Sequence, residues 1–479
     1  MTRSLCSSSL VLLAATLACS AARAQSNPQG SPVGGRSALM GNTGVALATD
    51  GAAPILNPAT ILRIRDDRLA LSANFYGYSY TTLRDFHAPT PARRDLYGDV
   101  SANEGITRQT VTTLPSTFCI FLTLVADRLV DRADLKRPRH KLAMCVASTE
   151  RSSFDAIGLG KTVGATSQTR SLVRDFGRTQ AGPTYALALG DKVALGASLF
   201  VALTSATWTT FGSTITQGPT SLVTSSYERA SDFSSWDLGA SLGVTYALDA
   251  FTTAGARVTF PVGHLLGSLD ATESSTFAID GTSTAAQRSL TGRAAAPTVP
   301  AIAVGIGREL QRFRVEANAT LHLPVAGLLS AELSGTSRGA DGATTPLSKE
   351  IAERGRPTVN GGVGLEIRAT PSLGVLTGFA TDIPMTGPVR GAPLLGELGY
   401  ARRTRAVFSA GVASRDGASE LLIGAQLGLA WGKSLALDGY ALPNELRVVD
   451  ERSTSVLLIV AGNASLAGIR RSFDRIRGR

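Results

Sequence analysis

After Asp66, apolar and polar residues alternate strictly over long segments. In residues 236–248, Trp, Leu, Ala, Val and Tyr share one face, and Asp, Gly, Ser and Thr share the other. Residues 313–323 and 421–431 repeat this pattern. Because side chains of a strand point alternately to its two faces, a period of two predicts strands with one apolar and one polar face.

About fourteen such strands can be marked along the chain. They are residues 67–82, 108–125, 141–150, 178–190, 192–209, 232–248, 252–264, 298–309, 312–324, 357–369, 372–383, 402–414, 419–436 and 452–466. Most exceed the five or six residues of an average soluble strand and are long enough to cross an outer membrane when tilted. We therefore predict an all-β transmembrane antiparallel barrel rather than a soluble β-sandwich or β-helix.

Short and long connections alternate between these strands, as in outer-membrane barrels. We expect long, Ser-, Thr- and Gly-rich external loops at residues 83–107, 151–177, 210–231, 265–297, 325–356, 384–401 and 437–451. Residues 126–140 break the rule, because this long charged connection falls on the side of the short turns. Trp208, Trp236 and Trp431 stand at predicted strand ends, where an aromatic girdle is expected.

The first 24 residues have the features of a secretory signal peptide. Arg3 precedes an apolar run, and Ala22-Arg23-Ala24 is a small-residue cleavage site. Cys19 leaves a lipoprotein alternative open, although Thr16 stands where the lipidation motif has Leu. The net charge is +10, and basic proteins often bind nucleic acid. An exported protein would not meet nucleic acid in the cell, so we expect the loop arginines to face water, lipid head groups or lipopolysaccharide.

The predicted mature chain contains two cysteines, Cys119 and Cys145, on neighbouring strands. If Ile120 pairs with Met144, the two cysteines lie directly opposite each other on the inner face. An oxidising compartment permits a disulfide, whereas strand geometry often forbids one. Both states remain open from the sequence, and a bond here would be a structural staple.

A segment rich in small residues, residues 34–59, precedes the first strand. Gly35-Arg36-Ser37-Ala38, Gly41, Gly44-Val45-Ala46, Asp50 and Asn57-Pro58-Ala59 resemble the opening and hatch motifs of the FadL/TodX-type outer-membrane transport proteins. Residues 260–267 and 381–385 resemble later strand ends of that family, more weakly. The resemblance implies a barrel plugged from inside by an N-terminal hatch, residues 25–66. It also implies transport of long-chain fatty acids or aromatic hydrocarbons.

Two features depart from the family. Its barrels tend to end on an aromatic residue, whereas this chain continues from the barrel, residues 67–466, into a basic tail, residues 467–479. The family's lateral exit depends on a kinked third strand, but residues 141–150 contain no Gly or Pro that would mark a kink. The sequence therefore does not support lateral release.

A hydrophobic solute needs an apolar route with few polar groups. We take Leu265, Leu266 and Leu328 from the long loops as candidate lining. Arg257 and Arg314 point inward by alternation and are candidate partners for a ligand carboxylate. The alternative for these arginines is an ion pair within the lumen, such as Arg314 with Glu316.

The sequence gives little support for an enzymatic function. The four histidines lie in separate segments without metal-ligand spacing, and neither a complete P-loop nor a G-x-S-x-G elbow is present. A hydrolase whose Ser and His meet only in space, with His264 or His322 as the base, stays open. We expect no cofactor, no metal and no nucleic acid. The expected partners of a monomeric barrel are a hydrophobic small molecule, outer-membrane lipid and the barrel assembly machinery. The alternative is a diffusion porin or a structural or adhesive barrel.

Overall fold

The computed structural model describes residues 31–86, 105–129, 132–163, 165–385, 387, 402–416, 419–438 and 445–468. The predicted signal peptide, residues 1–24, lies outside the described residues, as do the tail beyond residue 468 and most of the predicted loops 83–107 and 384–401. Among the residues described, no helix is long and apolar enough to cross a membrane.

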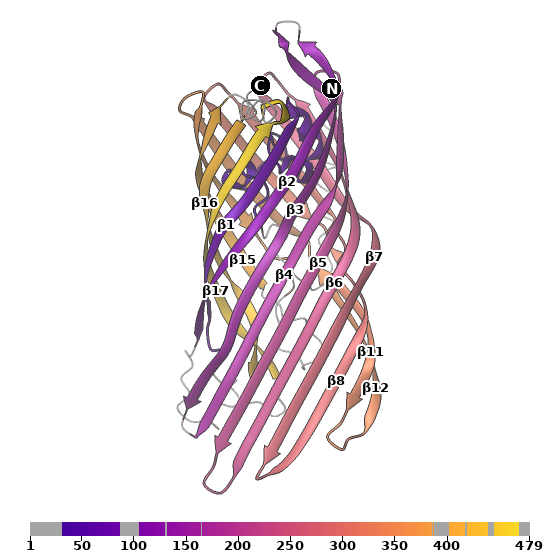
Figure 1. Cartoon of the computed structure of the whole chain (residues 1–479), viewed down its shortest axis with the longest axis vertical. Helices are drawn as coiled ribbons and strands as arrows, with labels where there is room; N and C mark the ends of the chain where they lie inside the picture. Colours follow the sequence, from indigo (N-terminus) through magenta and orange to yellow (C-terminus); the bar gives the residue numbers. More distant parts are fainter. Residues whose placement is uncertain are drawn as a thin grey trace, which may run out of the picture.

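Short helices precede a series of strands (Figure 1). The helices are α2 (Arg36–Leu39), α3 (Ala53–Leu56) and the 3-10 helix η1 (Pro58–Arg63). The strands are β1 (Arg68–Leu83), β2 (Ile106–Leu129), β3 (Arg132–Val163), β4 (Thr166–Leu189), β5 (Val193–Gln217), β6 (Leu222–Ala247), β7 (Thr252–Ile279), β8 (Thr282–Ala295), β9 (Ala301–Glu309), β10 (Phe313–His322), β11 (Val325–Arg338), β12 (Thr344–Gly355), β13 (Thr358–Arg368), β14 (Leu373–Asp382), β15 (Arg402–Asp416), β16 (Ser419–Asp438) and β17 (Glu445–Ser465).

Fourteen of the described strands close an antiparallel ring, which confirms the predicted fold. The ring runs from β1 to β7, continues through β9, β10 and β13 to β17, and returns to β1. Each predicted strand overlaps one strand of this ring. Because the number of strands is even, the ring begins and ends at the same end of the barrel. Figure 1 shows the ends of the chain there.

Four predicted loops are wrong because they form mostly strands, and two of them, residues 265–297 and 325–356, build a sheet outside the ring. Residues 252–259 of β7 pair with β9, and this pairing is part of the ring. Residues 268–279 of β7 pair instead with β8, which is not a strand of the ring. Strands β11 and β12 extend this sheet to give a three-stranded wing, β8-β11-β12, beyond the ring (Figure 1). The Ser- and Thr-rich composition suggested turns, but Thr also favours strands and the alternation continues through these segments.

Predicted loops 151–177 and 210–231 are also mostly strands, since they extend β3 to β6 well beyond the predicted ends. The long charged connection at 126–140 is largely a hairpin made by the ends of β2 and β3. It projects past the barrel at the end where the chain termini lie (Figure 1). The sequence predicted the ring strands but underestimated how far they continue beyond it.

The alternation places apolar side chains on the outer face and polar side chains on the inner face. On β6, Leu242 is 54% exposed, whereas Asp237 is fully buried. Trp236 and Trp431 lie on the outer surface, as expected for a girdle. Trp208 does not, because β5 continues to Gln217 and the parity of the strand turns Trp208 inward, where it is buried against Phe233 and Leu269.

Strands β2 and β3 are paired in the register that the sequence predicted. Cys119 lies opposite Cys145, and a disulfide joins the two residues, which are 26 positions apart in the sequence. Both sulfur atoms lie on the inner face, in contact with an apolar cluster that includes Phe121 and Ala143. The bond therefore joins two neighbouring strands of the wall where residues from the N-terminal segment pack against it.

We expect the Cys119–Cys145 peptides to be recovered as one linked species by non-reducing peptide mapping of the purified protein. Closing a loop of this size contributes about 3.5 kcal/mol in the chain-entropy model, so reduction should lower the melting temperature. A Cys119→Ala/Cys145→Ala variant should melt like the reduced protein. Recovery of both thiols free from protein kept under oxidising conditions would contradict the bond.

Candidate functional site

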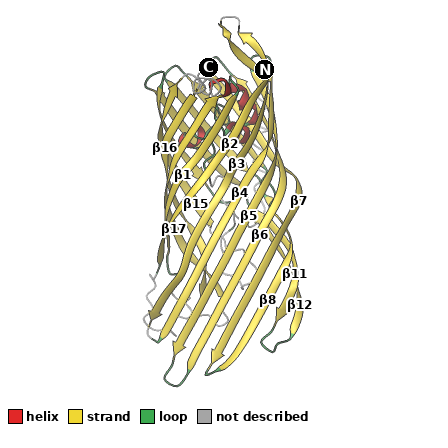
Figure 2. Cartoon of the chain, in the orientation of Figure 1, coloured by secondary structure: helices red, strands yellow, loops and turns green. Residues whose placement is uncertain are grey.

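The described N-terminal segment, residues 31–66, lies inside the barrel near the end where the chain termini lie (Figures 1 and 2). Most of its residues are buried. Prolines at the first turns of α3 and η1 favour the start of each of these two short helices, and Pro58 prevents α3 from continuing. Non-strand backbone at this depth is tolerated only when protein surrounds it, as the ring does here.

Arg36 joins this segment to the opposite wall. Its guanidinium is 4% exposed and forms ion pairs with Glu366 on β13 and Glu420 on β16. Arg415 on β15 pairs with the same two carboxylates, so two arginines and two glutamates form one buried cluster. Burial opposes the charge of Arg36, but the carboxylates of Glu420 and Glu366 outweigh it and hold the pKa of Arg36 above its ordinary value.

Asp50 holds the segment together internally. One carboxylate oxygen accepts from the backbone N–H of Ser37 at 3.0 Å, and the other from the Ser37 hydroxyl at 3.1 Å and the Ala52 N–H at 3.2 Å. These bonds connect the start of α2 to the start of α3. The acidic residue of the hatch-like motif is therefore a structural clamp in this protein.

Asn57 fastens the segment to the wall. Its side-chain amide donates to the carbonyl of Val45 at 2.6 Å and of Val244 on β6 at 3.1 Å, and its oxygen accepts from the Ala59 N–H at 3.1 Å. The backbone of Asn57 is extended, with φ −164° and ψ 109°, as a following proline requires. Both N–H groups and the oxygen of the Asn57 side chain therefore form hydrogen bonds, and Asn57 is fully buried.

Glycines of the wall let the segment approach the strand backbone closely. A Cβ on Gly243 would lie 2.0 Å from the Asn57 side-chain oxygen, and one on Gly196 would lie 2.4 Å from the backbone of Pro58. Within the segment, Gly41 has φ +68°, which favours glycine, and it touches the backbone of Gly378. The segment and wall therefore fit by backbone contact at several places.

Both predicted lumen arginines, Arg257 and Arg314, point inward and bind backbone carbonyls of the segment. Arg257 donates to Ile55, and Arg314 donates to Leu47. Glu316 accepts from the N–H groups of Ala46 and Leu47 at 2.8 and 3.3 Å. These wall residues therefore hold the segment, a role that the sequence alone did not suggest for Arg257 and Arg314.

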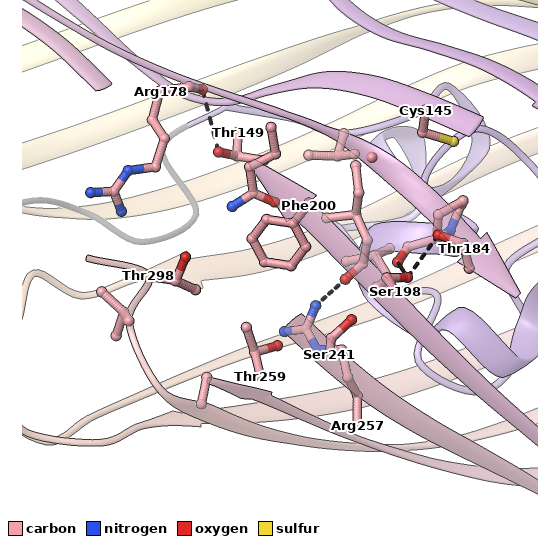
Figure 3. Close-up of a pocket in the computed structure, with 18 of the residues that line it drawn as sticks. Cys145, Thr149, Arg178, Thr184, Ser198, Phe200, Ser241, Arg257, Thr259 and Thr298 are labelled. Carbon is pink, nitrogen blue, oxygen red and sulfur yellow. Dashed lines mark hydrogen bonds between the residues drawn. The ribbon is translucent and has the colours of Figure 1, made fainter. Parts of the chain in front are cut away.

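A cavity of about 150 Å³ lies between the segment and strands β3 to β7, β9 and β10 (Figure 3). The segment contributes Val45, Ile55 and Leu56 to its lining. The wall contributes Phe200, whose ring faces the other labelled side chains in Figure 3, and Arg257. The cavity is therefore closed on one side by the N-terminal segment and on the other by the barrel.

Several polar atoms at the edge of this cavity have no hydrogen-bond partner among the described residues. They are both ring nitrogens of His322, the side-chain oxygens of Asn42, Thr259 and Thr298, and Nε of Arg257. Buried polar groups are usually paired, so this cluster of unpaired atoms marks a polar region beside the cavity; the atoms themselves are buried and do not line the open space. The burial of His322 follows from the alternation on β10, but its place beside this cavity does not.

The predicted apolar lining is partly wrong. Leu265 and Leu266 are 54% and 58% exposed on the outer surface, because β7 continues through the predicted loop and a register shift lies beside them. Leu328 is buried against Met385 and Val299. Val299 lines the cavity, but Leu328 does not. The lining comes instead from small polar and apolar residues, such as Ser198 and Ser241, that no local pattern distinguished.

No protein-family model matches this chain, and no curated protein matches it. Solved structures do. The Pseudomonas putida toluene transporter TodX aligns with a TM-score of 0.57 and 14% identity, over 92% of this chain and 99% of that one. A Pseudomonas aeruginosa FadL homologue aligns with a TM-score of 0.51 and 14% identity, over 93% of this chain and 100% of that one.

The CymD monoaromatic hydrocarbon channel aligns with a TM-score of 0.50 and 14% identity, over 92% of this chain and 98% of that one. At such identities the likeness concerns the fold, which extends over nearly the whole of each chain. The predicted resemblance to FadL/TodX-type barrels is confirmed at that level.

Proposed function

We propose that this protein is an outer-membrane channel for small hydrophobic molecules, closed by its N-terminal segment acting as a hatch. The observation that carries the proposal is the cavity between that segment and the wall. A solute in this cavity touches the hatch and the barrel together, so its binding and the position of the hatch are coupled.

The size and lining of the cavity favour a guest with one aromatic ring. An apolar cavity of about 150 Å³ is large enough for benzene. Phe200, Leu56 and Val45 supply apolar contact, and many polar residues, such as Ser241 and Thr259, also line the cavity. Ligand sites commonly combine an apolar lining with a few polar groups that set orientation. The printed names of TodX and CymD, toluene transporter and monoaromatic hydrocarbon channel, agree with this class.

The proposed channel works without covalent chemistry, cofactor or metal. The solute moves down its own gradient, and consumption inside the cell maintains that gradient. The apolar outer face would contact lipid and lipopolysaccharide, and the barrel assembly machinery would insert the chain after export. A monomer is sufficient because the cavity is built from one chain.

We expect Ser241→Phe to weaken the binding of toluene to the detergent-purified protein. Ser241 is 3% exposed and lines the cavity, so a phenyl ring there would occupy the proposed site. Toluene bound at saturation would be measured by mass spectrometry or by displacement of a fluorescent probe. Affinity should fall about tenfold or more, because overpacking excludes the guest.

Leu242→Phe is the matched control, since Leu242 is the next residue on β6 and points outward. It should bind toluene as the wild type does. Equal binding by both variants would refute the site, provided that Ser241→Phe still shows the heat-modifiable electrophoretic mobility of a folded barrel. Absence of any retained hydrophobic molecule in the wild type, together with an open conductance, would favour the diffusion porin.

A further inference from the structure

A second cavity, of about 790 Å³, lies at the end of the barrel where the chain termini lie. It is lined by the end of the N-terminal segment and by the short turns β9-β10, β13-β14 and β15-β16. The smaller cavity described above shares no lining residue with it. We call this second space the arginine basin.

The arginine basin has a strong excess of positive charge. Eight arginines but only three carboxylates are among its described lining residues. Six of the eight arginines have carboxylate partners or a carboxylate nearby. Asp66 pairs with Arg68, Glu309 pairs with Arg63 and Arg368, and Glu420 and the adjacent buried Glu366 share Arg36 and Arg415. Arg65 and Arg312 have no such partner among the described residues, and Arg314 lies near Glu316. Internal ion pairs therefore leave part of the positive charge without a counter-ion inside the protein.

Two observations show where an anion would find donors and positive charge. Arg65 and Arg312 are exposed at the basin, and among the described residues neither side chain forms an ion pair or a hydrogen bond; the backbone carbonyl of Arg312 accepts from the N–H of Arg368. Arg314 is 4% exposed and bonds Leu47 and Thr49, so it contributes buried positive charge beside the space rather than an accessible donor. The donors come from the segment end and from the β9-β10 hairpin, so they surround the space from two sides.

We propose that the arginine basin binds an oxyanion of the carboxylate or phosphate class. Planar guanidinium groups match the geometry of such anions and form charge-assisted hydrogen bonds with them. A concave site lined by one sign of charge also raises the local concentration of the counter-ion. The bound anion competes with Glu420 for Arg36 and Arg415, and so weakens the contact that holds the N-terminal segment to β16.

The test uses full-length protein in a nonionic detergent and two probes, inorganic phosphate and sodium octanoate, with octanol as the uncharged control. Binding is measured by isothermal titration calorimetry at low and high salt. The variant Arg65→Gln/Arg312→Gln removes two charges that make no internal ion pair. Arg338→Gln/Arg354→Gln removes two exposed arginines from β11 and β12 of the wing as the matched control.

We expect octanoate to bind about threefold or more weakly to the basin variant, and binding to weaken as salt rises. The control variant should bind like the wild type. Displacement of octanoate by phosphate would identify the oxyanion head as the recognised group. Octanoate binding that resists phosphate but still falls in the basin variant would identify an anionic amphiphile.

Equal octanoate affinity in the basin variant and the control variant would overturn the proposal, as would an absence of binding by both anions. Toluene and octanol report on the smaller cavity and should not respond to the basin variant. The outcome is therefore independent of the proposed function, which stands or falls on Ser241→Phe.

Discussion

Replacing Arg36 with methionine is expected to open the barrel. The change leaves Glu366 and Glu420 buried with Arg415 as their shared partner, and removal of one member of a buried ion-pair cluster costs about 3–5 kcal/mol. That cost falls on the contact between the N-terminal segment and β13 and β16, while the hydrogen bonds between strands remain. The segment should therefore detach before the barrel unfolds.

Single-channel conductance in planar bilayers measures this directly. Arg36→Met should conduct far more than the wild type, and Arg36→Met/Glu366→Gln should conduct less than the single variant because one uncompensated charge is removed. Arg174→Met is the control, since Arg174 is a buried arginine that pairs with Glu451 at 3.3 Å and donates to Ser434, away from the segment. A closed Arg36→Met channel would show that the cluster does not hold the hatch.

Replacing Asn57 with aspartate should release the segment more completely than replacing it with alanine. Aspartate keeps the acceptor for the Ala59 N–H but turns an oxygen toward the carbonyls of Val45 and Val244. Alanine removes both donors, so the carbonyl of Val45 loses its partner at a cost of about 1–3 kcal/mol, whereas Val244 remains paired within the sheet between β5 and β7. Aspartate adds a buried charge that faces two acceptors, so its cost is larger.

Labelling of a cysteine placed in the segment would follow this release. In an otherwise cysteine-free background, Ser37→Cys is buried and should react slowly with a water-soluble maleimide in the wild type. The reaction should accelerate in the order wild type, Asn57→Ala, Asn57→Asp. Equal rates for the two Asn57 variants would mean that the lost donors, not the introduced charge, determine the effect.

The ring could be predicted because its signal is local. Alternation along β6, β10 and β16 determines which residues face out, and an even number of strands follows from counting. The wing could not be predicted, because Ser and Thr serve both turns and strands and only the continued pairing of β7 with β8 distinguishes them. The same ambiguity hid the extensions of β3 to β6.

The contacts of the site join residues that are far apart in the sequence. The sequence therefore singled out several of the residues involved, but it did not indicate what each of them binds. Arg36 was part of the hatch-like motif, but its partners Glu366 and Glu420 lie 330 and 384 residues away. Arg257 and Arg314 were placed correctly on the inner face, yet their binding to segment carbonyls depends on where the segment lies in the barrel. No period or motif carries that information.

The seam between β1 and β17 has a consequence for assembly. It joins the two ends of the ring, from Arg68 opposite Ser465 to Leu83 opposite Glu451, and the N-terminal segment leads directly into β1. The segment acquires its ion-pair partners only after β13 and β16 exist. In any synthesis from the N-terminus, this segment therefore precedes by several hundred residues the strands that bury its ion pairs. A chain that lacks β13 to β17 would leave Arg36 without its carboxylate partners, so an incomplete barrel should expose this segment to added protease, whereas the finished barrel should protect it.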